Sequence, residues 1–381
     1  MAMKCGLLGE RLGHSRSPEI HRSLGDYEYR LYEKRPDEVE TFLRHGDYDV
    51  VNVTIPYKKT AYALCDEVSP IAKALGNVNV IVRRLDGTLW GDNTDAYGFG
   101  LLLDEVSAPV VGGKCVVLGT GGAASTAATV LRARGAAAVV FISRSGGDNY
   151  SNLDRHADAA VVVNATPVGM FPAVDAQPVS LSAFPRCRAV VDLIYNPETT
   201  RLLADAARRG IPAVGGMKML VGQAERASVY MNANFYLYGP PGSGKSTFGR
   251  RLAAQKGLPF VDLDDEIVRA DGRSIPRIFA EAGEGEFRRI EREALRRVAA
   301  GRNQVVALGG GALLDDSSRE LAETTGRVVL LTCDEAELAR RVASSDGRPL
   351  LAGDSAARLH RLLQSRRAHY ESFGERVSPE A

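Results

Sequence analysis

Short apolar runs recur along the chain, and most of them are followed by glycine or polar residues and then by a segment of helical composition. The runs are rich in valine, isoleucine and leucine and are bounded by turn residues, which is typical of buried strands. Strands that alternate with helices predict an α/β fold with parallel sheets. The runs that we expect to form strands lie at 3–9, 49–56, 75–84, 112–118, 136–143, 159–164, 190–194, 234–238, 258–262 and 305–308.

The composition is that of a globular protein with enough apolar material for more than one core. The chain has 381 residues, 45% hydrophobic and 25% charged, so we expect two or three domains. A net charge of +1 leaves no nucleic-acid footprint. No run approaches the ~18 apolar residues of a membrane span, and the five cysteines lack CxxC spacing. These features predict a soluble cytoplasmic protein with small-molecule ligands.

The segment GPPGSGKST (239–247) has the residue spacing of a phosphate-binding loop, and it follows an apolar run and precedes a helical segment. Glycines let backbone N–H groups converge on phosphate oxygens, and a helix N-terminus favours negative charge. Lys245 can then reach the β- and γ-phosphates, and Ser246 can bind Mg²⁺. We therefore predict a nucleoside triphosphate site, with an ordinary glycine-rich turn as the alternative.

A second glycine motif, G-x-G-x-x-A at 119–124, stands between a predicted strand and a predicted helix. Alone it is weak evidence for dinucleotide binding. The next apolar run ends in Ser-Arg-Ser at 143–145, where NAD-binding chains usually carry an acidic residue. Arg144 can pair with a 2′-phosphate, so the sequence favours NADP over NAD. The alternative is an exposed arginine without a ligand.

Polar motifs lie in or after the first three predicted strands: S-x-S-P at 15–18, N-V-T-x-P-x-K at 52–58, V-N after glycine at 78–79, and G-x-N-T-D at 91–95. Local evidence alone favours Ser15 and Ser17 as caps of the helix that Pro18 opens. It also favours Lys58 as a solvated surface residue.

In this order, however, the motifs resemble shikimate dehydrogenase. The resemblance implies that Lys58 and Asp95 form the catalytic pair, with Lys58 protonating the alkoxide that hydride transfer to a ketone leaves. It implies that Ser15 and Ser17 hold the substrate carboxylate. The other implied substrate ligands, several of them for the ring hydroxyls, are Asn52, Thr54, Asn79, Asp95, Tyr195 and Gln223.

The resemblance continues through N-A-T-x-x-G-M at 164–170 and through the helical segment 215–227, which returns to the substrate lobe. It implies a Rossmann lobe that binds NADP. The implied cofactor residues are Gly119, Gly121, Gly122, Ala123, Ser143, Arg144, Ser145, Asn164, Thr166, Gly169 and Met217.

The last third resembles shikimate kinase through the phosphate loop, D-x-D at 262–264, G-x-x-x-F-R-x-x-E at 283–291, GGG at 309–311, RPLL at 348–351 and R-x-x-x-Y at 366–370. The D-x-D pair alone can also be a helix cap. The resemblance implies that Asp264, Arg288, Gly310 and Arg366 bind shikimate, with Lys245 and Asp264 catalytic. It implies that Ser246 and Asp262 hold Mg²⁺. The implied ATP ligands are Gly239, Gly242, Ser243, Gly244, Lys245, Ser246, Thr247 and Arg348.

We therefore expect an α/β substrate lobe at 1–98 completed by a helix at 216–231, a Rossmann NADP lobe at 99–215, and a P-loop domain like the nucleoside monophosphate kinases at 234–381. The expected function is NADPH-dependent reduction of 3-dehydroshikimate followed by phosphorylation of shikimate with ATP and Mg²⁺. Because the chain ends soon after the Arg366 segment, we expect the kinase part to lack the family's last strand and helix. Two alternatives stay open: a regulatory or weakly active kinase part, and a quinate/shikimate dehydrogenase.

Overall fold

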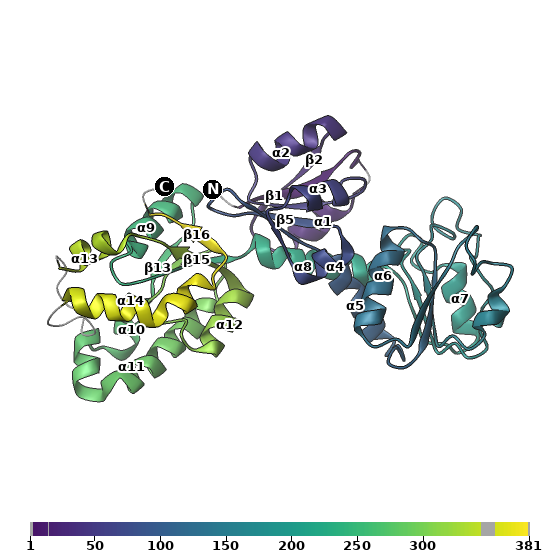
Figure 1. The fold of residues 1–381 in the computed structure, drawn as a ribbon. Helices are drawn as coiled ribbons and strands as arrows, with labels where there is room; N and C mark the ends of the chain where they lie inside the picture. The colour runs from purple at the N-terminus through teal and green to yellow at the C-terminus, as the bar shows by residue number, and fades with distance from the viewer. Residues whose placement is uncertain (1–2, 14, 344–354, 380–381) are drawn as a thin grey trace.

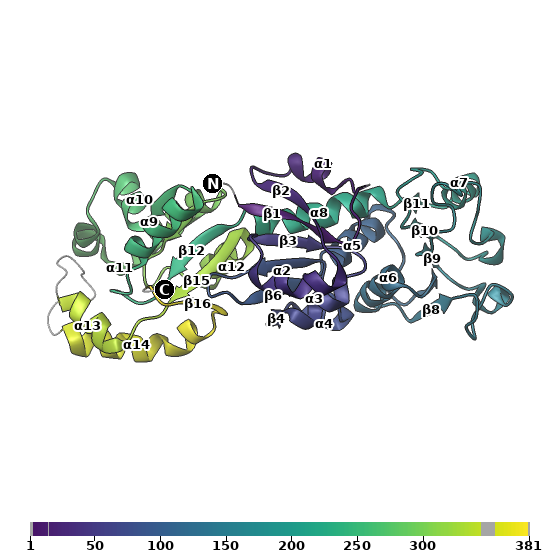
Figure 2. The same cartoon turned by 90° about the horizontal axis from the view of Figure 1, so that it is seen from above.

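The protein is described by a computed structural model that covers residues 3–13, 15–343 and 355–379. Three α/β units, each with its own sheet, lie in a row, and the first lobe stands between the other two (Figures 1 and 2). We call them the first lobe, the second lobe and the C-terminal domain. The expected α/β class is confirmed by this arrangement. Among the described residues, no helix combines the length and the apolar character that crossing a membrane requires.

The first lobe holds a six-stranded sheet in the order β2-β1-β3-β5-β6-β4, in which β5 runs antiparallel to both β3 and β6. Its elements are β1 Lys4–Gly9, α1 Ser17–Arg22, β2 Glu28–Glu33, the 3₁₀ helix η1 Pro36–Glu38, α2 Val39–His45, β3 Val50–Val53, α3 Lys58–Leu64, β4 Glu67–Val68, α4 Pro70–Leu75, β5 Val80–Arg83 and β6 Leu89–Asp92.

The register of these strands positions the polar motifs. Asn52 near the end of β3 is opposite Val80 at the start of β5, and Val80 is opposite Asp92 at the end of β6. Because β5 is antiparallel to its two neighbours, the ends of β3 and β6 meet at one edge of the sheet. The residues that follow these two strands, Lys58 and Asp95, therefore begin their helices at the same edge.

The second lobe holds a fully parallel sheet in the order β11-β10-β9-β7-β8. Its elements are β7 Lys114–Leu118, α6 Gly122–Ala133, β8 Ala138–Ile142, η2 Leu153–His156, β9 Val161–Asn164, η3 Leu181–Ala183, β10 Ala189–Asp192, α7 Arg201–Arg208 and β11 Ala213–Val214.

Two helices, α5 Asp95–Glu105 and α8 Met217–Met231, connect the first two lobes and pack closely together. A Cβ on Gly98 would lie 2.6 Å from the carbonyl oxygen of Met219, and one on Gly222 would lie 2.4 Å from Cδ1 of Leu101. Glycine at both positions is what allows this close approach.

The C-terminal domain holds a parallel sheet in the order β13-β14-β12-β15-β16. Its elements are β12 Asn234–Tyr238, α9 Lys245–Lys256, β13 Phe260–Asp262, α10 Leu263–Asp271, α11 Ile275–Ala299, β14 Val305–Ala307, α12 Asp316–Thr325, β15 Gly326–Leu331, α13 Glu335–Ala343, α14 Ser355–Glu371 and β16 Glu375–Val377. Helix α11 is interrupted at Gly283, which has a φ of 77°.

The strand β16 corrects one sequence-based expectation. We expected the last strand of this domain to be lacking, but Val329–Leu331 of β15 pair in parallel with Glu375–Val377. The strand has only three residues, one of them glutamate, so no apolar run signals it in the sequence. Its position in the sheet rests on the pairing with β15.

Candidate active sites

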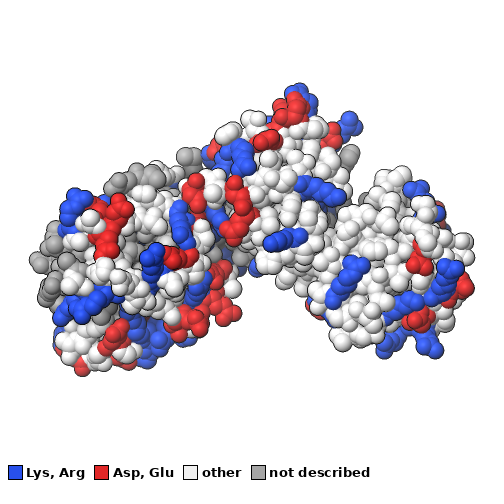
Figure 3. Space-filling view, viewed as in Figure 1, with Lys and Arg blue, Asp and Glu red and all other residues white. Residues whose placement is uncertain are grey.

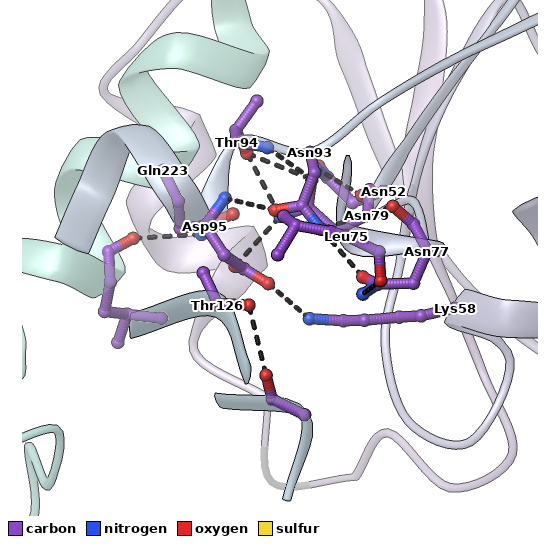
Figure 4. Close-up of polar contacts among 12 residues, drawn as sticks. Asn52, Lys58, Leu75, Asn77, Asn79, Asn93, Thr94, Asp95, Thr126 and Gln223 are labelled. Atoms are coloured by element: carbon purple, nitrogen blue, oxygen red, sulfur yellow. Dashed lines mark hydrogen bonds and ion pairs between the residues drawn. The ribbon is translucent and has the colours of Figure 1, made fainter. Parts of the chain in front are cut away.

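The first candidate site centres on Lys58 and Asp95. Lys58 is the first residue of α3 and Asp95 is the first residue of α5. Their side chains form an ion pair, with Nζ 2.5 Å from Oδ2, and both are mostly but not completely buried (Figure 4). Local sequence evidence favoured Lys58 as a solvated surface residue, and this expectation is wrong. The sheet edge that holds Asp95 also holds Lys58.

An amide network fixes the carboxylate of Asp95 (Figure 4). Nδ2 of Asn79 donates to Oδ1 of Asp95 at 2.9 Å, and Oδ1 of Asn79 accepts the backbone N–H of Thr94 at 2.7 Å. Oδ1 of Asn93 accepts the backbone N–H of Asp95 at 3.1 Å. One carboxylate oxygen of Asp95 is thus held by Asn79, and the other faces Lys58.

Asn52 is held by a residue that the sequence did not single out. The hydroxyl of Tyr29 in β2 donates to Oδ1 of Asn52 at 2.9 Å, while Nδ2 of Asn52 makes a long bond of 3.4 Å to the carbonyl of Asn79. Tyr29 takes one of the two lone pairs of this oxygen and Asn79 takes one amide N–H, so one acceptor site and one N–H of Asn52 are left for a ligand. A tyrosine on a half-buried strand carries no motif that could have revealed this contact.

The remaining expected substrate ligands surround this edge less tightly. Gln223 of α8 lies against the first turn of α5, since a Cβ on Gly98 would be 3.2 Å from its backbone nitrogen. Its side chain donates to the carbonyl of Leu220 at 2.9 Å. Thr54 is half-buried just beyond β3, and Tyr195 is 39% exposed beyond β10.

The helix caps that local evidence favoured for Ser15 and Ser17 do not form. Helix α1 begins at Ser17 itself, its N-cap residue is Arg16, and no side chain caps it. Oγ of Ser15 instead accepts the backbone N–H of Ser17 at 3.2 Å.

Three segments meet at one edge of the second-lobe sheet. Leu118 pairs with Ile142 of β8 on one side and with Asn164 of β9 on the other. The glycine turn after β7, the 143–145 segment and the N-A-T segment therefore lie together where strand order reverses, the usual dinucleotide site of such sheets. Gly119 has a φ of 101°, and its Cβ would lie 3.1 Å from Cγ2 of Thr166.

The turn fits a pyrophosphate. Helix α6 begins at Gly122 with Gly121 as its N-cap, and a Cβ on either glycine would meet no protein atom within 4 Å. These glycines leave open space beside the N–H groups of a helix N-terminus, which is what a bound phosphate requires. Ala123 follows in the first turn, and Gly169 and Met217 lie beyond β9 and at the start of α8.

The other expected NADP ligands divide into exposed and buried residues. Arg144 and Ser145 are exposed, and Arg144 forms no ion pair with any described residue. Ser143 already accepts the backbone N–H of Gly146 at 2.9 Å. Asn164 is fully buried: it accepts the hydroxyl of Thr166 at 2.7 Å and donates to Asp192 at 3.0 Å. A direct contact of Asn164 with a cofactor stays a prediction.

The second candidate site is a cavity of about 390 Å³ in the C-terminal domain, between the phosphate loop, the start of α10, α11, the GGG segment and α14. Gly239, Gly242 and Gly244 have φ values of 141°, 87° and 83°, which L residues rarely adopt. Nζ of Lys245 donates to the carbonyls of Gly239 and Pro240 at 2.9 and 3.0 Å. The loop therefore curls around its own lysine at the N-terminus of α9, with Ser243 just before the helix and Thr247 in its first turn.

The residues expected to hold Mg²⁺ are already joined. The hydroxyl of Ser246 donates to Oδ2 of Asp262 at 2.6 Å. Oδ1 of Asp262 accepts the backbone N–H of Asp264 at 3.1 Å and so caps α10. Oδ1 of Asp262 thus acts as the helix cap that the D-x-D pair alone allowed, and Oδ2 of Asp262 faces Ser246. A hydroxyl beside a carboxylate is a donor set that suits Mg²⁺.

Arg288 is anchored by Glu291, which the sequence motif contained but which we had not assigned to the site. Nη1 of Arg288 lies 2.6 Å from Oε2 of Glu291, and Glu291 is 3% exposed. Burial raises the pKa of Glu291 above its ordinary value, although the charge of Arg288 opposes this shift. The GGG segment makes room for this pair: a Cβ on Gly309 would lie 2.7 Å from Glu291, and one on Gly311 would lie 2.8 Å from Arg288.

On the other side of the cavity, the carbonyl of Gly310 accepts hydrogen bonds from two side chains of α14. It accepts Nη1 of Arg366 at 2.9 Å and the hydroxyl of Tyr370 at 2.8 Å. Arg288 and Arg366 both line the cavity, together with Asp264. The expected ATP ligand Arg348 lies outside the described residues.

Charges of both signs are interspersed on the face shown in Figure 3. Recognition of an anionic ligand therefore depends on local groups such as the two cavity arginines.

Comparison with known proteins decides the family. The model for the substrate-binding domain of shikimate dehydrogenase matches residues 7–81, and the model for shikimate kinase matches residues 241–381. The NADP(+) shikimate dehydrogenase of Clostridium perfringens is 35% identical over 248 residues, which are 60% of this chain and 91% of that protein. The shikimate kinase of Stenotrophomonas maltophilia is 47% identical over 145 residues, which are 38% of this chain and 81% of that protein.

The chain belongs to both families. Its first two lobes are a shikimate dehydrogenase and its C-terminal domain is a shikimate kinase, as the motifs indicated.

Solved structures agree with this for the dehydrogenase. The Thermus thermophilus shikimate 5-dehydrogenase, in complex with NADP(H) and shikimate, is 33% identical with a TM-score of 0.53, covering 59% of this chain and 92% of that one. A chorismate mutase/shikimate 5-dehydrogenase fusion from Clostridium acetobutylicum is 33% identical with a TM-score of 0.56, covering 60% of this chain and 90% of that one.

Proposed function

We propose that this chain reduces 3-dehydroshikimate to shikimate with NADPH and then phosphorylates the 3-hydroxyl of shikimate with ATP and Mg²⁺. The observation that carries the first half is the Lys58–Asp95 pair at an edge where Asn52 and Asn79 also converge. The observation that carries the second half is a phosphate loop that shares one cavity with two arginines and Asp264.

In the dehydrogenase, we assign the role of proton donor to Lys58. The bound nicotinamide supplies a hydride to the ketone carbon, and the carbonyl oxygen becomes an alkoxide that needs a proton. The ammonium of Lys58 stabilises the growing negative charge and then transfers its proton to that oxygen. Asp95 keeps Lys58 in position and can accept a ring hydroxyl, because Asn79 fixes its carboxylate from the other side.

Substrate orientation in the dehydrogenase rests on polar groups from three directions. Asn52, Thr54 and Asn79 present amide and hydroxyl groups from the sheet edge, and Gln223 presents an amide from α8. We propose that Ser15 and Ser17, at the start of α1, bind the substrate carboxylate. We propose that Tyr195 contacts the substrate from the second lobe.

The cofactor preference follows from Arg144. Its guanidinium is exposed and without an ion pair among the described residues, next to the sheet edge where the adenosine ribose of a dinucleotide lies. It can form a charge-assisted bond with a 2′-phosphate, which only NADPH carries.

In the kinase, we assign to Asp264, which lines the cavity, the role of accepting the proton of the attacking hydroxyl. Arg288 and Arg366 can hold the shikimate carboxylate, with Gly310 between them. Bound ATP supplies the γ-phosphoryl group, which the N–H groups of the phosphate loop and Lys245 orient. Ser246 and Asp262 would hold Mg²⁺, which when bound would supply positive charge beside the phosphates.

We propose domain boundaries at 1–98 and 99–215, with 216–231 returning to the first lobe and the kinase at 234–381. The ends of α8 at Met231 and the start of β12 at Asn234 support the last boundary. We also propose a cytoplasmic location, because the five scattered cysteines suit a reducing compartment.

The decisive experiment measures ADP formation by the purified chain with ATP and Mg²⁺, with and without shikimate. Oxidation of NADPH by 3-dehydroshikimate is measured in the same preparation as the control for folding. Shikimate-dependent ADP formation that Lys245→Met abolishes, with NADPH oxidation retained, would support both activities. No ADP from a preparation that oxidises NADPH would reject the kinase half. Preferred turnover of quinate with NAD would reject the dehydrogenase half.

A further inference from the structure

The dehydrogenase and the kinase share a hydrophobic core. One row of residues crosses the first-lobe sheet at register positions Tyr29, Cys5, Val50, Val82 and Trp90, on β2, β1, β3, β5 and β6. All five belong to or pack against a cluster that also contains kinase residues. The buried members from the kinase are Phe235, Leu237, Phe248, Leu252, Ala253, Val305, Val329, Leu331 and Val377.

This core lies directly beside the dehydrogenase site. The next row on the same sheet face, two residues further along the strands, contains Asn52, Val80 and Asp92. Val80 belongs to the shared core, whereas Asn52 and Asp92 are polar and buried. The sheet face that carries Asn52 is therefore the face that the kinase helps to cover.

A buried ion pair of the kinase holds the turn between β5 and β6. Arg327 in β15 and Glu375 in β16 are paired through two bonds of 2.6 and 3.2 Å, and their side chains are only 8% and 7% exposed. Nη2 of Arg327 also donates to the carbonyl of Arg83 at 3.2 Å, and Oε1 of Glu375 accepts the backbone N–H of Leu85 at 2.8 Å. Buried charges need hydrogen-bond partners, and here the dehydrogenase supplies two of them, the carbonyl of Arg83 and the N–H of Leu85.

The β5–β6 hairpin connects the kinase contact with the dehydrogenase site. Its far end is held by the kinase at Arg83 and Leu85, while its near end leads into Asn79 on one strand and into Asp95 beyond the other. A second contact holds the near end: the hydroxyl of Tyr230 in α8 donates to Oδ2 of Asp92 at 2.6 Å. Helix α8 runs on into the first kinase strand, β12.

We propose that the kinase domain is a structural part of the dehydrogenase: it covers the sheet face that carries Asn52, and its Arg327–Glu375 pair positions the β5–β6 hairpin beside Lys58 and Asp95. Arg327 and Glu375 are then positioning residues for a reaction in another domain. This inference rests on the dehydrogenase function proposed above.

Trp90 tests whether the two domains unfold together. It is the single tryptophan of the chain, it lies in β6, and its ring is 5.3 Å from that of Tyr230 in the shared core. Its fluorescence therefore reports unfolding of the hairpin. We expect ADP with Mg²⁺, bound at the kinase phosphate loop, to raise the midpoint of the Trp90 thermal transition by about 2 °C or more at saturation. In Lys245→Met, which weakens ADP binding, the shift should disappear.

Kinetics test whether Glu375 positions the dehydrogenase site. Glu375→Ala leaves the Leu85 N–H and the Arg327 charge without their partner, so we expect KM for 3-dehydroshikimate to rise about 2- to 30-fold. KM for NADPH should stay near wild type, because the cofactor site lies in the second lobe. Glu375→Gln keeps an oxygen for the Leu85 N–H and should recover much of the loss. Glu286→Ala, which removes an exposed kinase ion pair with Arg289, is the matched control.

Two results would overturn the inference in protein that oxidises NADPH normally. In the first, ADP leaves the midpoint of the Trp90 thermal transition unchanged but raises the midpoint of a separate thermal transition that is followed by circular dichroism. The other is Glu375→Ala with both KM values of the dehydrogenase unchanged. Wild-type protein without NADPH oxidation would instead count against the proposed function.

Discussion

Nζ of Lys58 lies 2.5 Å from Oδ2 of Asp95, although 37 positions separate the two residues in the chain. Each is the first residue of a helix, and the two helices begin at the same sheet edge. The positive end of a helix dipole favours Asp95 at its position and disfavours an ammonium group at the position of Lys58. Asp95 offsets that cost, and the pair is what a proton donor beside a reducible ketone requires.

Replacing Lys58 by methionine should therefore lower kcat of the dehydrogenase by about 10²- to 10⁴-fold, because the alkoxide loses its proton donor. Shikimate-dependent ADP formation by the same protein should be unchanged. Steady-state NADPH oxidation measures the first effect. A kcat within twofold of wild type would contradict the role that we propose for Lys58.

Arg144→Ala should raise KM for NADPH by about 10- to 100-fold, the value of one lost charge-assisted contact, and should leave KM for NADH nearly unchanged. Arg186→Ala is the matched control: Arg186 is also exposed but precedes β10, at the opposite edge of the same sheet. Equal losses with both cofactors would show that Arg144 does not contact a 2′-phosphate.

Gly311→Ala should raise KM of the kinase for shikimate by roughly 10- to 100-fold, because small displacements of a positioning group are costly. The added Cβ would lie 2.8 Å from Nη2 of Arg288, which Glu291 and Glu284 hold in place. Gly285→Ala is the control, since its Cβ would meet no atom within 4 Å. Dehydrogenase activity should be normal in both variants. Unchanged kinase kinetics in Gly311→Ala would mean that Arg288 does not hold the substrate.

His21 should make the first lobe sensitive to acid. Its ring is 1% exposed, stacks on Tyr29 with centroids 4.0 Å apart, and has Nδ1 2.7 Å from the hydroxyl of Tyr27. Burial lowers the pKa of His21 from 6.5 to about 4. Between these values the unfolded chain binds the proton more readily, so stability is present above pH 6.5 and is lost as pH falls towards 4, by about 3 kcal/mol in total.

His21→Phe keeps the stacking and removes the proton-binding site. We expect the loss of unfolding free energy between pH 7 and pH 4.5 to be about 2 kcal/mol smaller in this variant than in wild type. Urea unfolding followed by Trp90 fluorescence measures the difference. Equal losses in the two proteins would show that His21 can be protonated without unfolding.

The motifs that the sequence identified correctly are contiguous. The phosphate loop, the G-x-G-x-x-A turn and the Asn93–Asp95 loop each combine a strand end, a turn and a helix start in a few residues, so their local geometry follows from local sequence. The order of the motifs along the chain then identified the families, because the motifs of a family occur in a fixed order.

The residues that the sequence did not reveal act across long separations. Tyr29 orients Asn52, and Arg327 with Glu375 holds Arg83 and Leu85, from strands that meet only in the folded sheets. The strand β16 escaped notice for a different reason: three residues with one glutamate carry no apolar pattern. The caps predicted for Ser15 and Ser17 failed because helix α1 begins at Ser17, one residue earlier than capping by Ser17 requires.

By itself, the sequence determined the two enzyme families, the nucleotide turns and the identity of Lys58, Asp95, Lys245 and Arg288 as candidates for chemistry. Only the tertiary structure decided which groups hold those candidates in place and which sheet face the kinase covers. The physical reason is that hydrogen-bond partners and shared cores depend on register and packing between strands distant in the chain, and these are set when the sheets assemble.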